Sequence, residues 1–132
     1  MTTANTVLEG FIEGVLGLDK SIRWVGVASS EGELLFVKRR KDLVPLMTHE
    51  ENQEYTQSAI NRHKSRIKFE AKIGKLLYAL GKYEKLTRVV TPINDNFYLL
   101  ITFDIEELDF DYLMLEKVIP YVTSKKDNIP PR

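Results

Sequence analysis

Cysteine is absent from this 132-residue sequence, and histidine occurs only twice. The absence of cysteine excludes disulfide bonds, thiolate zinc sites, iron–sulfur clusters and cysteine nucleophiles. The two histidines, His49 and His63, do not have the i, i+4 spacing of a helical metal-binding pair. We therefore expect neither a metal site nor a cofactor.

Long apolar runs and an excess of one charge are also lacking. No stretch approaches the roughly 20 apolar residues of a membrane-spanning helix, and the first residues lack the pattern of a secretory signal. Nineteen basic side chains balance nineteen acidic ones, so no overall field favours nucleic acid or anionic lipid. We expect a cytoplasmic protein with one domain at residues 1–123 and a flexible, proline-containing tail at 124–132.

The sequence does not contain the usual motifs of an enzyme. Gly10, Gly14 and Gly17 lie within or at the end of a predicted helix, whereas a nucleotide-binding loop needs a strand before its glycines. Ser29 and Ser30 fall in a polar turn and do not form a nucleophile elbow. We therefore expect a non-enzymatic protein with no catalytic residues.

The clearest pattern is a hairpin over residues 22–37, IRWVGVASSEGELLFV. Strand-forming residues flank a polar turn in which Gly32 can adopt a positive φ. The first strand is apolar on both faces after Arg23, which predicts a place inside a sheet. The second strand runs into the charged residues 38–41, which is typical of an edge strand.

A helix is predicted before this hairpin and a longer one after it. Asn5 or Thr6 can cap the first helix, and Gly17 can end it. Thr48 and Glu51 form a capping box that begins the second helix.

The second helix, residues 49–73, has apolar side chains on two separate stripes. One stripe holds Tyr55, Ala59, Phe69 and Ile73, and the other holds Ile60, Ile67 and Ala71. A helix with two apolar stripes needs two partners, namely its own sheet and a second chain. The predicted dimer contacts are Ile60, His63, Ile67 and Ala71.

Either Gly74 or Gly81 can end this helix, and we favour a strand at about residues 76–80. A second hairpin follows, with strands at 86–93 and 97–103. Asp104 and Glu107 form a capping box for a last helix, whose apolar positions are Leu108, Tyr112, Leu115, Ile119 and Val122. Pro120 is expected to kink this helix or to end it near Ile119.

The resulting order, α-β-β-α-β-β-β-α, predicts an α+β sandwich with helices on both faces. The segment VLEGFIEGVLGLDKSIRWVGVASSEGELL, together with NFYLLITFD and the acidic start of the last helix, resembles the roadblock family of dynein light-chain-like and GTPase-regulating proteins. It is also similar to longin and profilin-like domains and to small archaeal proteins. The roadblock resemblance implies a five-stranded antiparallel sheet and homodimers formed around the second helix and third strand.

Basic residues are concentrated at the end of the second helix. Lys64, Lys68 and Lys72 share one stripe, which is either a solvated face or a weak nucleic-acid site. Arg62 and Arg66 project with the apolar residues. They either pair with carboxylates of the acidic segment 104–111 or of a partner, or converge with Arg88 on an anionic ligand or acidic partner.

Three functions remain open at this stage. The first is a homodimeric interaction or scaffold domain of roadblock type that regulates a small GTPase. The second is a small-ligand sensor with a cavity beside Trp24 or Tyr78. The third is a weak nucleic-acid binder. An enclosed cavity favours the sensor, and an intermolecular sheet favours the scaffold.

Overall fold

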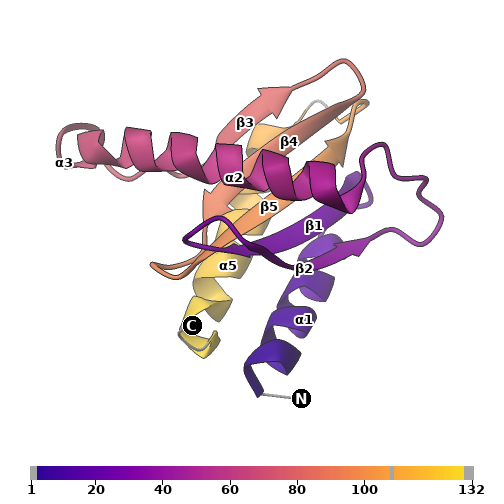
Figure 1. Ribbon diagram of the computed structural model, residues 1–132, viewed down its shortest axis with the longest axis horizontal. Helices are drawn as coiled ribbons and strands as arrows, with labels where there is room; N and C mark the ends of the chain where they lie inside the picture. The colour runs from indigo at the N-terminus through magenta and orange to yellow at the C-terminus, as the bar shows by residue number, and fades with distance from the viewer. Residues whose placement is uncertain (1–2, 108, 130–132) are drawn as a thin grey trace.

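The computed structural model describes residues 3–107 and 109–129. Five strands form one antiparallel sheet: β1 Ile22–Ser29, β2 Leu34–Arg39, β3 Ala79–Lys82, β4 Leu86–Pro92 and β5 Phe97–Asp104. Their order is β2-β1-β5-β4-β3, so β5 is the middle strand and β2 and β3 are the edges (Figure 1). The predicted interior positions of the first and last strands and the edge position of the second are confirmed.

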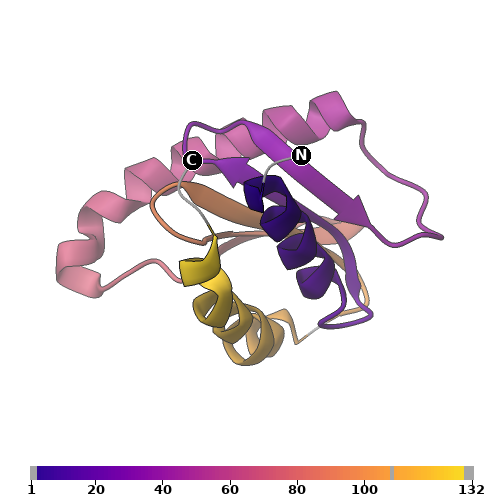
Figure 2. The same cartoon turned by 90° about the horizontal axis from the view of Figure 1, so that it is seen from below.

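The helices are α1 Thr3–Leu16, α2 His49–Arg66, α3 Glu70–Ile73, α4 Phe110–Leu113 and α5 Ile119–Lys125. A 3-10 turn over Ile67–Phe69 joins α2 to α3, and a π-helical turn over Met114–Val118 joins α4 to α5. The predicted element order is confirmed, although the second and last helices are each built from more than one segment. Figure 2 shows α1 and α5 on one face of the sheet and α2 on the other.

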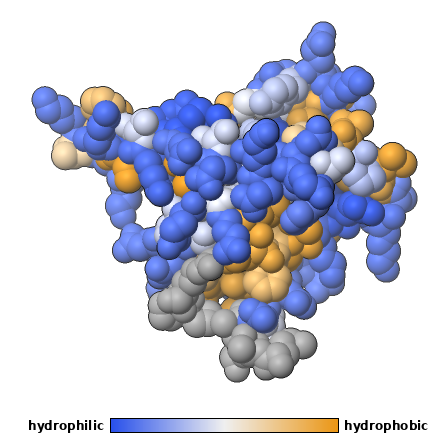
Figure 3. All heavy atoms as spheres, viewed as in Figure 1, coloured by the Kyte–Doolittle hydropathy of each residue, from blue (hydrophilic) through white to orange (hydrophobic). Residues whose placement is uncertain are grey.

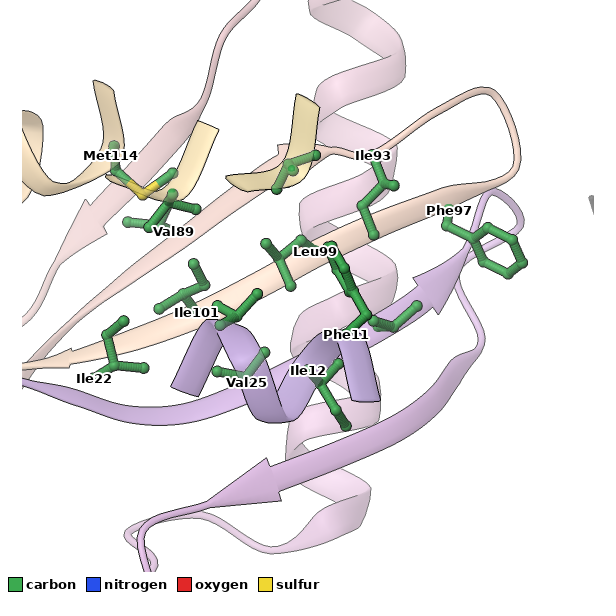
Figure 4. Close-up of a cluster of buried hydrophobic side chains, with 14 of the residues drawn as sticks. Phe11, Ile12, Ile22, Val25, Val89, Ile93, Phe97, Leu99, Ile101 and Met114 are labelled. Carbon is green, nitrogen blue, oxygen red and sulfur yellow. The ribbon is translucent and has the colours of Figure 1, made fainter. Parts of the chain in front are cut away.

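The main hydrophobic core lies between the sheet and the layer of α1, α4 and α5 (Figure 4). Phe11 and Ile12 of α1 and Met114 of the last helix meet the sheet at Val25 and Leu99. A smaller cluster on the other face joins α2 to the sheet. Because both faces are covered, β1, β4 and β5 carry apolar side chains on both sides.

The two predicted hairpin turns are confirmed, but they use different means. Gly32 adopts φ +99° in the first turn, as predicted. In the second turn the Asn94 side chain accepts hydrogen bonds from the backbone N–H groups of Asn96 and Phe97, at 2.8 and 3.0 Å. Among the described residues only glycines have a positive φ, so this turn relies on the side chain of Asn94 rather than on a left-handed backbone.

The start of α2 matches its prediction. The Thr48 hydroxyl accepts from the Glu51 N–H at 3.1 Å, and the Glu51 carboxylate accepts from the Thr48 N–H at 2.8 Å. Both halves of the capping box are therefore formed. A loop over residues 40–48, which contains Pro45, leads from β2 into α2.

The predicted start of the first helix is wrong, because α1 begins at Thr3 and includes both Asn5 and Thr6. The predicted strand at 76–80 exists but is displaced to Ala79–Lys82. The preceding segment is held by two side chains instead of a strand ladder. Leu76 N–H donates to Glu70 Oε2 at 2.9 Å, and Thr91 Oγ1 donates to the Leu77 carbonyl at 2.7 Å.

The predicted capping box at Asp104 is also wrong. Asp104 ends β5 and accepts hydrogen bonds from Arg23 at 2.9 Å and from Arg40 at 2.8 Å. These charges come from distant parts of the chain and keep its carboxylate away from the helix, which begins six residues later at Phe110. Leu108, predicted as part of the last helix, lies outside the described residues.

The last helix does not end at Ile119. Pro120 lies directly after the π-helical turn, and the altered hydrogen bonding of that turn accommodates a residue without an N–H inside a continuing helix. The proposed domain boundary at residue 123 falls within α5, which continues to Lys125, and Ile129 is buried in the main core. Residues 130–132 of the predicted tail lie outside the described residues.

Candidate functional site: the surface of α2, α3 and β3

The 3-10 turn Ile67–Phe69 and α3 form an arm, residues 67–73, that reaches past the end of the sheet (Figures 1 and 2). Apolar side chains on the arm are exposed: Phe69 is 55% accessible and Ile73 is 83% accessible, and Ile67 is also exposed. Gly74 ends α3 with φ +88°, which turns the chain back toward the sheet. The arm therefore presents apolar surface that the described part of this chain leaves uncovered.

The chain returns from the arm to the edge strand β3, whose one neighbour in the sheet is β4. Leu77, just before β3, and Leu80, within it, are both exposed. Figure 3 shows this face as mainly hydrophilic over α2, with a hydrophobic patch at the α3 end. The arm and β3 together place exposed apolar side chains beside an open sheet edge, which is a recurrent setting for protein association.

The Tyr78 side chain ties the segment before β3 to the last helix. Its hydroxyl donates a hydrogen bond to Asp111. Burial and this bond raise the pKa of Tyr78 to about 12, so the phenol is neutral at physiological pH. The link fixes the path of the chain into β3 from the α4 side.

The four predicted dimer contacts divide into two pairs. Ile60 is 0% accessible and His63 is 6% accessible within a single chain, since both face the sheet. Ile67 and Ala71 are exposed on the arm. Ile60 and His63 are thus not open to a partner, whereas Ile67 and Ala71 remain predicted contacts.

The sheet-facing side of α2 explains this division. Its buried residues are Thr56, Ala59, Ile60 and His63. They follow the i, i+3, i+4, i+7 spacing of one helical face. Two members are polar, so a count of apolar residues assigned Ala59 and Ile60 to different stripes.

His63 is the titratable group on that buried face. Its ring meets Tyr98 edge-on, with the centroids 4.8 Å apart and an interplanar angle of 75°. Burial lowers the pKa of His63, nearby Glu70 opposes the shift, and Arg66 adds to it. His63 therefore favours its neutral form, and its ring packs against Tyr98 on the buried face of α2. Among the described residues, no group of three His, Asp or Glu side chains is placed to hold a metal ion.

Arg62 and Arg66 line one shallow cleft between α2 and β3, with a volume of about 250 Å³. Tyr55 and Tyr83 lie in the same cleft, and the Arg62 guanidinium is 5.9 Å from the centroid of the Tyr55 ring. No carboxylate of the described residues lies within salt-bridge distance of either arginine. The interpretation that the acidic segment 104–111 neutralises them within the chain is therefore wrong.

Arg88 approaches the same tyrosine from β4. Its guanidinium carbon lies 3.8 Å from the Tyr55 ring centroid, and the side chain is buried. Arg62 and Arg88 thus share Tyr55, whereas Arg66 is brought only into the cleft. Lys64, Lys68 and Lys72 are exposed on α2, the following turn and α3.

Sequence reasoning missed Tyr55 and Tyr83 as cleft residues, and it missed Leu77 and Leu80 as exposed apolar positions. The alternation of Leu80 with small Ala79 and Gly81 could have indicated an edge strand with one open face. The exposed leucines offer apolar contact, and the arginines of the cleft offer cationic hydrogen-bond donors. This combination suits the binding of a protein surface. No helix in the described part of the chain is long and apolar enough to cross a membrane.

Comparisons with known proteins place the fold. The sequence matches no protein-family model and no curated protein. The structure is similar to the gliding protein MglB from Thermus thermophilus, with a TM-score of 0.73, 11% identity and coverage of 97% of this chain and 94% of that one. It is also similar to a Roadblock/LC7 domain from Streptomyces avermitilis, with a TM-score of 0.68, 11% identity and coverage of 91% and 95%.

A third similar structure is described as MglB with tetrameric arrangement, with a TM-score of 0.72, 12% identity and coverage of 98% and 95%. The likeness spans nearly the whole length in each case. The chain therefore has the Roadblock/LC7 fold, as its resemblance implied.

Proposed function

We propose that this chain is a non-enzymatic, cytoplasmic interaction domain that forms a homodimer through its arm and the edge of β3, and that the dimer docks a small GTPase. The observation that carries the dimer is the set of exposed apolar residues on the arm and β3. Ile73, at 83% accessibility, is the extreme member. The tetrameric arrangement described for MglB, which has the same fold, supports self-association.

A second copy fits this surface for two reasons. Pairing of β3 with its symmetry mate satisfies the outward backbone groups of both edges and extends the sheet across the two chains. The same twofold arrangement brings the arm of each chain over its partner, which covers Phe69, Ile73 and Leu77. A stable interface needs roughly 1,200 Å² of buried surface, and arm and strand together offer apolar anchors for it.

The roadblock-type fold and the charge on α2 support the proposal of a small GTPase as partner. Arg62 and Arg66 have no carboxylate partner in the described residues, and Lys64 lies beside them in the sequence. Unpaired arginines at a cleft rim suit an acidic patch on a partner protein. We place the GTPase contact on this cationic side of α2.

The dimer is tested by light scattering coupled to size-exclusion chromatography. The wild-type chain is expected at twice the monomer mass. A variant with Ile73→Asp and Leu80→Lys is expected at the monomer mass, because it places charge in the apolar contact. The matched control is Val44→Asp, which changes an equally exposed residue on the loop at the opposite end of α2. A monomeric wild-type chain at all concentrations, or equal dissociation of the control, contradicts the proposal.

The GTPase contact is tested by titrating purified small GTPases from the same organism, loaded with GDP or a GTP analogue, against the dimer. Arg62→Glu with Arg66→Glu is expected to weaken binding at least tenfold without dissociating the dimer. Lys117→Glu, on the opposite face of the sheet, is the control. If none of these GTPases binds, or if the double variant binds as tightly as wild type, this contact is excluded.

A further inference from the structure

A second cavity lies at the N-terminal end of α2, away from the arm. It has a volume of about 280 Å³ and opens between the loop over residues 40–48, the first turn of α2 and the sheet. Trp24, Thr102 and Arg88 form its floor as direct neighbours on β1, β5 and β4. The Trp24 ring lies over Gly26, where a side chain would collide with it, so the indole is held flat along its own strand.

Arg88 is a buried cation that has no anionic partner within the described part of the chain. Its side chain is 3% accessible, and it donates to the Met47 sulfur at 2.9 Å and to Asn52 Oδ1 at 3.1 Å. Both acceptors are uncharged, and Arg88 Nε has no hydrogen-bond partner among the described residues. Burial lowers the pKa of Arg88, but a guanidinium remains protonated at physiological pH.

The contacts of Arg88 offset only part of the free-energy cost of burying its charge. Its guanidinium stacks at 3.8 Å from the Tyr55 ring centroid and lies 5.5 Å from that of Trp24. Cation–π contacts offset only part of the cost of desolvating a charge. An oxyanion in the cavity would supply the missing counter-charge and acceptors.

The other arginines of the lining add positive charge. Arg39, the neighbour of Trp24 on β2, also lines the cavity, whereas Arg23 is already paired with Asp104. The 18-residue helix α2 begins at His49, on the cavity wall, and the partial positive charge of its N-terminal end is offset in part by Glu50 and Glu51 of its first turn. None of the described residues that line the cavity is acidic.

The remaining walls are apolar and are formed by Leu43, Leu46 and Met47 of the loop. An apolar wall with a few converging polar groups is the usual composition of a small-ligand site. The volume is slightly below the usual lower limit of roughly 300 Å³ for such sites, which restricts the occupant to a small molecule.

We propose that this cavity binds a small organic anion whose carboxylate or phosphate group meets Arg88 and Arg39 and whose apolar part packs on Trp24 and the loop. The site is separate from the arm and does not depend on dimerisation. It gives the chain a ligand-responsive surface at the start of the helix whose other end we assign to partner contact.

Trp24 is the sole tryptophan of the chain, so its fluorescence reports directly on the cavity. The probes are phenyl phosphate, benzoate, inorganic phosphate and neutral benzyl alcohol, each titrated with excitation at 295 nm. We expect a saturable change with phenyl phosphate or benzoate and at least tenfold weaker binding of benzyl alcohol. Comparison of phenyl phosphate with benzoate identifies the preferred anionic group. Failure of both aromatic anions to saturate, or equal binding of the alcohol, overturns the proposal.

Three variants assign the binding to its residues. Arg88→Met is expected to weaken binding of the preferred probe at least tenfold. Because Arg88 is buried and its variant can fail to fold, the exposed Arg39→Glu provides a second test with the same expected direction. Lys41→Glu makes the same charge change on the loop but does not line the cavity, and it is expected to stay within about twofold of wild type. Unchanged binding by Arg39→Glu overturns the proposal.

Discussion

Replacing Ile60 or Ile73 of the α2–α3 segment by alanine should have opposite effects on folding and association. Ile60 is fully buried against its own sheet, and Ile73 is largely exposed on the arm. Ile60→Ala is therefore expected to lower the free energy of unfolding of the single chain. Ile73→Ala is expected to leave that free energy nearly unchanged and to weaken the proposed dimer.

The magnitude follows from the packing of each side chain. Truncation of a fully buried isoleucine costs about 3 kcal/mol, because burial of the removed groups is lost and a cavity remains. At this chain length each kcal/mol shifts the melting temperature by about 4 °C, so Ile60→Ala should melt about 12 °C lower. Truncation of an exposed side chain stays within about 0.5 kcal/mol.

The assay is urea unfolding followed by far-ultraviolet circular dichroism, at two protein concentrations tenfold apart. The monomer term is read at the lower concentration, and the difference between concentrations reports association. If Ile60→Ala unfolds like wild type at low concentration but loses its concentration dependence, Ile60 is an intermolecular contact and the packing of α2 described above is wrong.

Two further predictions concern pH. Burial alone would raise the pKa of Asp104, but hydrogen bonds from Arg40 and Arg23 outweigh burial and lower the pKa. The contribution of Asp104 to stability is therefore complete above about pH 4, and it is lost as the pH falls through the pKa of the folded state. Asp104→Asn should cost about 1 to 2 kcal/mol at pH 7 in urea unfolding, and a cost that does not shrink below pH 4 would contradict the ion-pair role. Burial lowers the pKa of His63, so the free energy of unfolding should fall as the pH decreases below about 6.5. His63→Phe should flatten this dependence between about pH 7.5 and 5.5. An unchanged slope would rule out His63 as the group responsible.

Local sequence signals predicted the elements whose determinants are close in the chain. The Thr48 capping box, the Gly32 turn and the two hairpins depend on residues within a few positions of one another. The Asp104 capping box followed the same kind of rule and failed. Arg23 and Arg40 are distant from Asp104 in the sequence. Their ion pairs with its carboxylate form only when β1 and β5 pair in the sheet.

The candidate site was predictable only in part. Exposed apolar residues on the arm were placed on the second helix, but the side that faces the sheet includes Thr56 and His63, which a hydrophobic pattern does not register. The isolation of Arg88 likewise depends on which side chains of α2 and the loop lie above it. This environment depends on how the layers of the fold pack and cannot be inferred from residues that are adjacent in the sequence.

The two edges of the sheet differ in a way that limits the size of any assembly. β2 ends in Lys38 and Arg39, and Arg40 and Lys41 follow directly, so repulsion between such basic ends discourages pairing of strands on that side. β3 is short and carries little charge along its first three residues. A sheet that pairs at one edge alone stops growing after one partner is added, which agrees with the proposed dimer and not with an open fibre.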